Sequence, residues 1–250
     1  RIVIEEPQRH RVQGGEECLV ISTNGATDGA STLVIFIHGD GSGGGASDYL
    51  SKTAYRYGTD DAVAVNLIRP GYFDSPGNHS TGTSYRSQGD GYRPEIIAAG
   101  ADAIQHLKTH HRVERVVLGG PAGGAAISGV ILGRFPGLAD AAVLAACPCH
   151  VPDWRYMRRG QNTWTRSQSP HEFADTVPAT ARVIAVTGAG PCVFRVPEME
   201  QALTASFSPD SIKDGMVADD DLNNDIHASG NYRAHLIGVL ARRAVAEANG

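Results

Sequence analysis

A short glycine-rich turn is the first place where residue types and spacing suggest chemistry. The letters GGPAGG cover residues 119–124, after an apolar run typical of a buried strand and before an apolar stretch of helical character. Small residues on both sides of position 122 would let a strand turn sharply into a helix and lift the middle side chain away from the backbone. Backbone N–H groups at the start of such a helix can hold an oxyanion. The middle residue is Ala122, which has no nucleophilic atom.

Two more glycine-rich segments follow apolar runs, namely HGDGSGGG at 38–45 and RPGYFDSPG at 69–77. Because ligand sites of parallel sheets lie at the carboxyl ends of the strands, we expect these segments and the turn at 119–124 to meet at one edge. Residues 39–44 also match the G-x-G-x-x-G pattern of dinucleotide-binding proteins. The next strand ends in NLIRPG without the acidic residue that holds a ribose, so we rank this reading lower.

The elements that must position these segments alternate between strand and helix. This alternation favours an α/β fold with a mostly parallel central sheet and helices on both faces. We expect one domain over residues 1–250, with residues 149–180 as a small lid-like insertion. The expected strands are 1–8, 16–23, 32–41, 61–71, 113–120, 139–148, 181–190 and, weakly, 210–218, and the expected helices are 46–58, 92–111, the stretch from 122, 196–207 and 232–248.

Composition excludes several classes of function. The chain has 250 residues and a formal net charge of -5, so no basic field favours nucleic acid as a partner. No apolar run reaches the roughly 20 residues that a membrane-spanning helix needs. We expect a small-molecule substrate, and the sequence leaves the oligomeric state open.

The three segments together resemble the α/β-hydrolase family, and they are most similar to bacterial hydrolases of esterase or dienelactone-hydrolase type. FIHGDG resembles the oxyanion-loop strand, RPGYFDSPG the loop after the following strand, and VVLGGPAGGAA the nucleophile elbow. The resemblance extends from His38 to the last helix. It implies an α/β-hydrolase fold and a serine nucleophile where this chain has Ala122. The implied chemistry requires no metal and no organic cofactor.

The resemblance also implies a histidine before the last helix and a carboxylate after a late strand. His227 matches the histidine by position, whereas His235 lies inside the helix. The sequence departs from the family pattern at the acid, because Cys192 stands close to where the carboxylate is expected. Asp153 is our first choice for the acid, by a small margin. The alternatives are Asp220, Asp225, Glu198 and a replaced residue at position 192.

With a serine at position 122, the implied mechanism is acyl transfer. His227 would take the serine proton, and the serine oxygen would attack the acyl carbon of an ester. The N–H groups of Gly123 and of Asp40 or Gly41 would stabilise the oxyanion. An amide or peptide bond is the second substrate option.

Three accounts of Ala122 remain open. In the first, serine has been replaced by alanine, giving an inactive variant that traps substrate. In the second, the protein is a naturally non-catalytic α/β-hydrolase-like protein that binds a ligand or partner. In the third, the glycine turn is only structural. We favour the first, because the oxyanion glycines and the histidine before the last helix remain.

The segment VPDWRYMRRGQNTW at 151–164 mixes aromatic residues with arginines. It could form an aromatic wall for an apolar acyl group, with arginines for an acidic substrate. It could equally be a surface helix whose aromatic residues pack inward. The first reading predicts substrate contacts from His150, Trp154, Tyr156 and Trp164.

The cysteines and the acidic segment carry weaker predictions. Cys147 and Cys149 lack the two-residue spacing of zinc sites. Cys149 and Cys192 follow neighbouring strands and could form a disulfide, with Cys147 as the competitor. A disulfide would favour a secreted or periplasmic location over the cytoplasm. The acidic segment 218–227 lacks the glycine and glutamate of an EF-hand loop, so we predict no metal there.

Overall fold

The computed structural model of the protein describes residues 2–6, 9–26, 28–41, 45–85, 90–186, 196–220, 222 and 229–249. The chain divides into two compact units, residues 1–186 and residues 187–250, and each is described by itself. The prediction of a single domain stays a prediction. His227, Asp225 and Cys192 lie outside the described residues, so their roles are not tested.

An eight-stranded sheet forms the centre of the first unit, in the order β1-β2-β3-β5-β4-β6-β7-β8. The five strands from β5 to β8 pair in parallel, whereas β1, β2 and β3 form an antiparallel meander that joins β5. The predicted, mostly parallel sheet is therefore confirmed. The strands are β1 Ile2–Glu6, β2 Arg9–Gly14, β3 Glu17–Gly25, β4 Thr32–Ile37, β5 Ala62–Leu67, β6 Arg115–Pro121, β7 Ala141–Ala145 and β8 Arg182–Val186.

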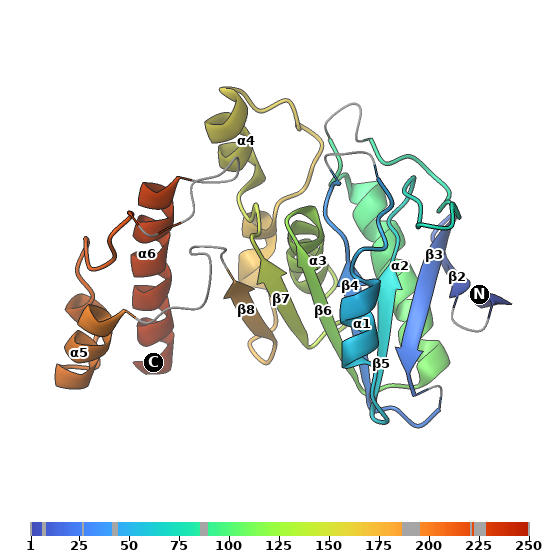
Figure 1. The fold of residues 1–250 in the computed structure, drawn as a ribbon, viewed down its shortest axis with the longest axis horizontal. Helices are drawn as coiled ribbons and strands as arrows, with labels where there is room; N and C mark the ends of the chain where they lie inside the picture. The colour runs from blue at the N-terminus through green and yellow to red at the C-terminus, as the bar shows by residue number, and fades with distance from the viewer. Residues whose placement is uncertain are drawn as a thin grey trace. The chain divides into compact units, whose positions relative to one another are not determined.

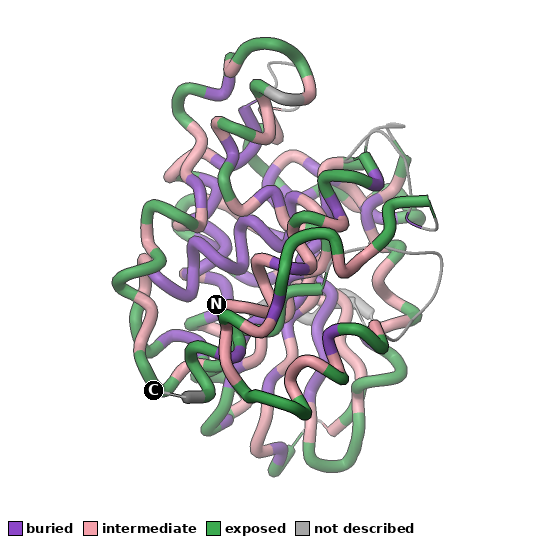
Figure 2. The backbone as a smooth tube through the Cα atoms, turned by 90° about the vertical axis from the view of Figure 1, so that its left-hand side faces the viewer, coloured by how far each residue is buried: buried purple, intermediate pink, exposed green. Residues whose placement is uncertain are grey.

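Helices cover both faces of the sheet, as predicted. The short helix α1 (Ser51–Tyr57) packs on one face, where the rings of Phe36 and Tyr57 lie 5.7 Å apart. The longer helices α2 (Pro94–His111) and α3 (Gly123–Arg134) cover the other face (Figure 1). Burial of apolar side chains between α2, α3 and the sheet forms the main core. Figure 2 shows the buried residues along the backbone in purple.

The predicted lid segment, residues 149–180, contains α4 (Val151–Arg159) and the 3₁₀ helix η2 (Pro170–Thr176). Its backbone is tied to the rest of the first unit. The Gln168 N–H donates to the Tyr92 carbonyl, and the Thr176 hydroxyl donates to the Gly133 carbonyl at the end of α3. The role of the segment as a lid stays a prediction.

The second unit contains α5 (Pro197–Ala205), the 3₁₀ helix η3 (Pro209–Ser211) and α6 (Gly230–Asn249). They pack around a small core of Met199, Ile212 and Val245. The weak strand expected at 210–218 is wrong, because this segment forms a turn with Gly215 at a φ of 80°.

One strand was missed from the sequence. β2 (RHRVQG) has only one strongly apolar residue, Val12, so it lacks the alternation that predicts a strand. Its backbone pairs with β3 along its whole length. Pairing with neighbours, rather than residue pattern, therefore makes this segment a strand.

Candidate active site

Ala122 occupies a strained turn between the end of β6 and the start of α3. Its φ is 47° and its ψ is -114°, a region that residues with a side chain rarely adopt. Its N–H donates to the Ala145 carbonyl at 2.9 Å, which fixes the turn against β7. Gly120 and Gly124 leave no room for a side chain, since a Cβ on either would overlap the carbonyl of Ile37. The sharp strand-to-helix turn expected from GGPAGG is therefore present.

His38 is a structural residue beside the turn. It is fully buried, and its Nε2 accepts the Arg69 N–H at 3.0 Å. Its Nδ1 must then carry the proton, and it donates to the Gly39 carbonyl at 2.7 Å. Burial, followed by the charge of Arg69, lowers the pKa of His38 well below 6.5. This histidine is therefore neutral at neutral pH, with both ring nitrogens engaged.

A partly buried ion pair holds the Asp40 carboxylate in place. Arg69 donates to Asp40 at 2.8 Å, and the hydroxyl of Tyr92 donates to its other oxygen at 2.6 Å. The side chain of Arg69 is 3% exposed and that of Asp40 is 30% exposed. Burial lowers the pKa of Arg69, but the charge and hydrogen bond of Asp40, together with Tyr72 and Tyr92, outweigh burial, and the net shift is upward. Burial and the Asp40 charge raise the pKa of Tyr92, which keeps its hydroxyl a neutral donor.

The Asp40 carboxylate faces the first residue of α3. A Cβ built on Gly123 would lie 2.8 Å from each carboxylate oxygen of Asp40. Within the described part of the chain, the N–H groups of Asp40, Gly41 and Gly123 donate a hydrogen bond to no acceptor. These three N–H groups are the predicted hydrogen-bond donors to an oxyanion. The negative charge of the Asp40 carboxylate lies beside them.

Sequence reasoning missed three side chains at this site. The sequence pattern places Arg69 at the end of a predicted strand and the start of the next loop, and Tyr92 at the start of a predicted helix. Tyr49 was not singled out, yet its hydroxyl accepts the Gly39 N–H at 2.7 Å. An arginine directly after a buried strand was the one available signal, because such a charge needs a buried partner.

Three of the candidate acids are among the described residues, and they come from different segments of the chain. Asp153 is in the first turn of α4, and its carboxylate lies 3.1 Å from Nδ1 of His150. Its side chain is 73% exposed. Glu198, in the first turn of α5, and Asp220 are exposed residues of the second unit. The choice of acid stays a prediction.

The two tryptophans of α4 and the following loop pack inward. Trp164 is 8% exposed, and its ring lies 5.0 Å from that of Tyr92 and 5.5 Å from that of Trp154. The Arg155 guanidinium lies 4.8 Å above the Trp164 ring. This arrangement supports the packing reading for both tryptophans, whereas Tyr156 is 65% exposed. Their contact with substrate stays a prediction.

Two histidines of the same segment also meet. The rings of His150 and His171 stack with centroids 3.7 Å apart. Nδ1 of His171 bonds the hydroxyl of buried Ser169 at 2.7 Å. No group of three or more His, Cys, Asp or Glu residues that could hold a metal ion occurs among the described residues.

The expected pairing of Cys149 with Cys192 is wrong. Cys149 is bonded to Cys147, with their Cα atoms 5.1 Å apart. The chain bends between β7 and α4, where Ala146 has a φ of 47°, and this bend brings the two cysteines within disulfide distance. Cys18 has a free thiol.

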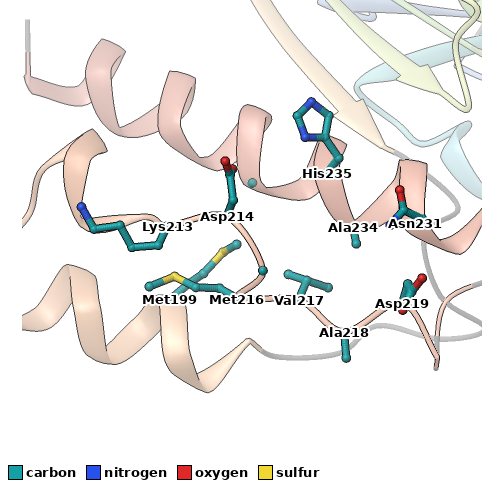
Figure 3. A pocket seen from close by; sticks show the side chains of 12 residues that line it. Met199, Lys213, Asp214, Met216, Val217, Ala218, Asp219, Asn231, Ala234 and His235 are labelled. Atoms are coloured by element: carbon teal, nitrogen blue, oxygen red, sulfur yellow. The ribbon is translucent and has the colours of Figure 1, made fainter.

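A separate pocket of about 450 Å³ lies within the second unit (Figure 3). It is lined by α5, α6 and the turn between them, and His235 sits on α6 as expected. In Figure 3 His235 points away from Met199 and Met216.

In the part of the chain that is described, no helix is long and apolar enough to cross a membrane.

Comparison with known proteins identifies the fold but no close relative. No family model matches the sequence, and no curated protein matches it. An acylaminoacyl peptidase of Pyrococcus horikoshii superposes over 73% of this chain with a TM-score of 0.52 and 14% identity. The chain spans 31% of the length of that peptidase. An esterase of Pyrococcus furiosus gives a TM-score of 0.48 and 12% identity over 72% of this chain and 69% of its own. The chain has the α/β-hydrolase fold.

Proposed function

We propose that this chain carries the binding site of a serine-type hydrolase of carboxylic esters, with Ala122 in place of the nucleophile. The observation that carries the proposal is the backbone of Ala122. A positive φ at an alanine is unfavourable, and the glycines at 120 and 124 keep the turn tight. This strained geometry serves to present a side chain at the start of a helix, although an alanine has nothing to present.

Restoring a serine would complete the acyl-transfer chemistry. The serine oxygen would attack the ester carbonyl, His227 would accept its proton, and the alcohol would leave after protonation by the same histidine. Water would then release the carboxylic acid. The N–H groups of Gly123 and Asp40 would stabilise the oxyanion, each contributing about 2.7–4 kcal/mol to the transition state. Asp153 remains the first candidate for orienting His227.

The test is an Ala122→Ser variant assayed with p-nitrophenyl esters of short and long acids. We expect a burst of p-nitrophenol and a covalent acyl-enzyme detectable by mass spectrometry, with neither in the parent chain. Ala122→Gly is the matched control, because it keeps the turn and adds no nucleophile. A folded Ala122→Ser protein that forms no acyl-enzyme with any of these esters would refute the proposal.

A second function, ligand binding without catalysis, is favoured by the Asp40 carboxylate beside Gly123. A negative charge there repels an oxyanion and attracts a cationic group or a hydrogen-bond donor. Under this alternative, benzylamine would raise the unfolding midpoint more than benzoate does. An Asp40→Asn variant would lose that preference, and an equal effect of the two compounds on the parent chain would argue against the alternative.

A further inference from the structure

A small polar pocket lies on the face of the sheet that α1 covers. The residues that line it are far from Ala122 in the sequence. Its volume is about 160 Å³. The lining side chains that carry oxygen come from β3, β5, the start of α1 and the loops beside them: Ser22, Asn24, Asn66, Ser51, Asp48 and Asp74. We propose that this pocket is a Ca²⁺ site.

Two buried oxygen atoms in the pocket lack partners. Asn66 is 1% exposed, and its Nδ2 donates to the Ser51 hydroxyl at 3.2 Å. Its Oδ1 has no hydrogen-bond partner among the described residues, and neither has the hydroxyl oxygen of Ser22. Ser22 and Asn66 are paired directly across β3 and β5, so both side chains lie on the same face. Because an unpaired buried polar atom is costly, these two oxygens indicate a missing ligand.

Two carboxylates complete the set of oxygens. Asp74 is 3% exposed and accepts two hydrogen bonds from Asn78, both from neutral donors. Asp48 accepts a hydrogen bond from the Ser75 hydroxyl. Within the described residues, neither carboxylate forms an ion pair with a basic side chain. Two acidic groups that line one pocket, neither of them in an ion pair among the described residues, favour a bound cation.

The chemistry of these side chains selects the cation. All six offer oxygen, and none offers nitrogen or sulfur as a metal ligand, which disfavours zinc and copper. Ca²⁺ accepts roughly six to eight oxygen ligands of mixed type in flexible geometry, including amide and hydroxyl oxygens and water. Mg²⁺ retains most of its own water and is less suited to neutral protein oxygens. Water alone would also fill the pocket, and the experiment distinguishes it from Ca²⁺.

A cation bound in this pocket would hold together the loops that position the residues around Asp40. Asp48 precedes Tyr49, whose hydroxyl accepts the Gly39 N–H. The pocket also includes Ile68, which precedes Arg69, the ion-pair partner of Asp40. Bound Ca²⁺ would therefore join two segments that lead directly to the residues around Gly39.

The experiment measures Ca²⁺ binding by the whole chain after treatment with EDTA and removal of the chelator. We expect titration calorimetry to show one Ca²⁺ per chain, and Ca²⁺ to raise the midpoint of thermal unfolding in a saturable way. Mg²⁺ and Na⁺ at matched ionic strength are expected to have a smaller effect. Neutralising one carboxylate ligand by Asp48→Asn should weaken Ca²⁺ binding by about tenfold or more.

Ser22→Ala provides a second variant, because it removes one orphaned oxygen with little change in volume and should also weaken binding. Asp175→Asn, an exposed carboxylate of η2, is the matched control and should bind Ca²⁺ like the parent. Absence of heat and of any midpoint change at millimolar Ca²⁺ would show that only water occupies the pocket. Binding that is unchanged in both Asp48→Asn and Ser22→Ala would place the ion elsewhere, and equal stabilisation by all three ions would reduce the effect to screening.

Discussion

The carboxylate of Asp40 lies against the backbone of Gly123, so that a Cβ at Gly123 would be 2.8 Å from both carboxylate oxygens. Arg69 and Tyr92 hold the carboxylate there through hydrogen bonds of 2.8 and 2.6 Å. The start of α3 is where a tetrahedral intermediate would place its negative oxygen. A fixed acidic group at this place would oppose oxyanion binding, and its effect can be measured.

Removing that charge should increase hydrolysis in a chain with serine at position 122. We expect Ala122→Ser/Asp40→Asn to exceed Ala122→Ser in kcat/KM by roughly tenfold, or about 1.4 kcal/mol, because a like charge beside the oxyanion is lost. The same change should lower the free energy of unfolding by about 1–3 kcal/mol, since Arg69 loses its anion. Ester kinetics and urea unfolding check both effects, with Asp175→Asn as the control. A double variant no faster than Ala122→Ser would contradict the repulsion.

Gly124 should not tolerate a side chain. Gly124→Ala would push its Cβ into the carbonyl of Ile37 and should lower the free energy of unfolding by about 3 kcal/mol or more. Gly100→Ala on α2 is the matched control, because its Cβ would make an ordinary contact at 3.7 Å with Ile131. That change should stabilise the protein by about 0.5–1 kcal/mol through helix propensity. Denaturant unfolding of the two variants measures the contrast, and similar stabilities would contradict the tight turn.

The packing of the tryptophans predicts a difference between two aromatic substitutions. Trp164→Ala should lower the free energy of unfolding by about 3–5 kcal/mol, because the ring is buried against Tyr92 and Trp154. Tyr156→Ala should change it by less than about 0.5 kcal/mol, since Tyr156 is 65% exposed. Thermal or chemical unfolding of the two variants provides the measurement. If Tyr156→Ala raised KM of the Ala122→Ser protein without loss of stability, Tyr156 would be a substrate contact.

His38 should make stability depend on pH. The unfolded chain gains a proton on this residue near pH 6.5, whereas burial lowers the pKa of His38 in the folded chain. The stabilisation that neutral His38 provides is therefore fully present above pH 6.5. Below pH 6.5 the free energy of unfolding falls as the pH is lowered, by up to about 1.4 kcal/mol per pH unit. His10, whose pKa is lowered by burial and then by the charge of His110, adds to the slope with the same sign.

The contribution of His38 can be isolated by comparison with His38→Gln. Urea unfolding of the two proteins between pH 5 and pH 8 should give a steeper pH dependence for the parent. Identical slopes would show that His38 is already protonated in the folded protein or is not buried.

The disulfide between Cys147 and Cys149 can be tested without an activity assay. Trypsin should release residues 135–155 as one peptide that holds both Cys147 and Cys149 and gains two hydrogens on reduction. Its short loop should contribute only about 1.5 kcal/mol to stability in the chain-entropy account. Mass spectrometry of the non-reduced digest tests the pairing, and a peptide linked to Cys192 would overturn it.

Local patterns in the sequence predicted most of the fold. The alternation of apolar strands with helical segments indicated the parallel sheet and helices on both faces, because periodicity follows from burial on one or two faces. The glycines around Ala122 indicated the sharp turn, since only a residue without Cβ fits so close to a neighbouring strand.

Other features depend on residues that are far apart in the chain. Asp40 and Tyr92 are separated by 52 positions, and only the folded sheet brings the Tyr92 hydroxyl to the carboxylate. The strand Arg9–Gly14 lacks an apolar pattern, and hydrogen bonding to its neighbour determines its structure. Ser22 and Asn66 face one pocket because β3 and β5 pair in a particular register. Sequence periodicity reports which side of an element is buried, whereas contacts between elements depend on register and side-chain direction, which only the tertiary structure determines.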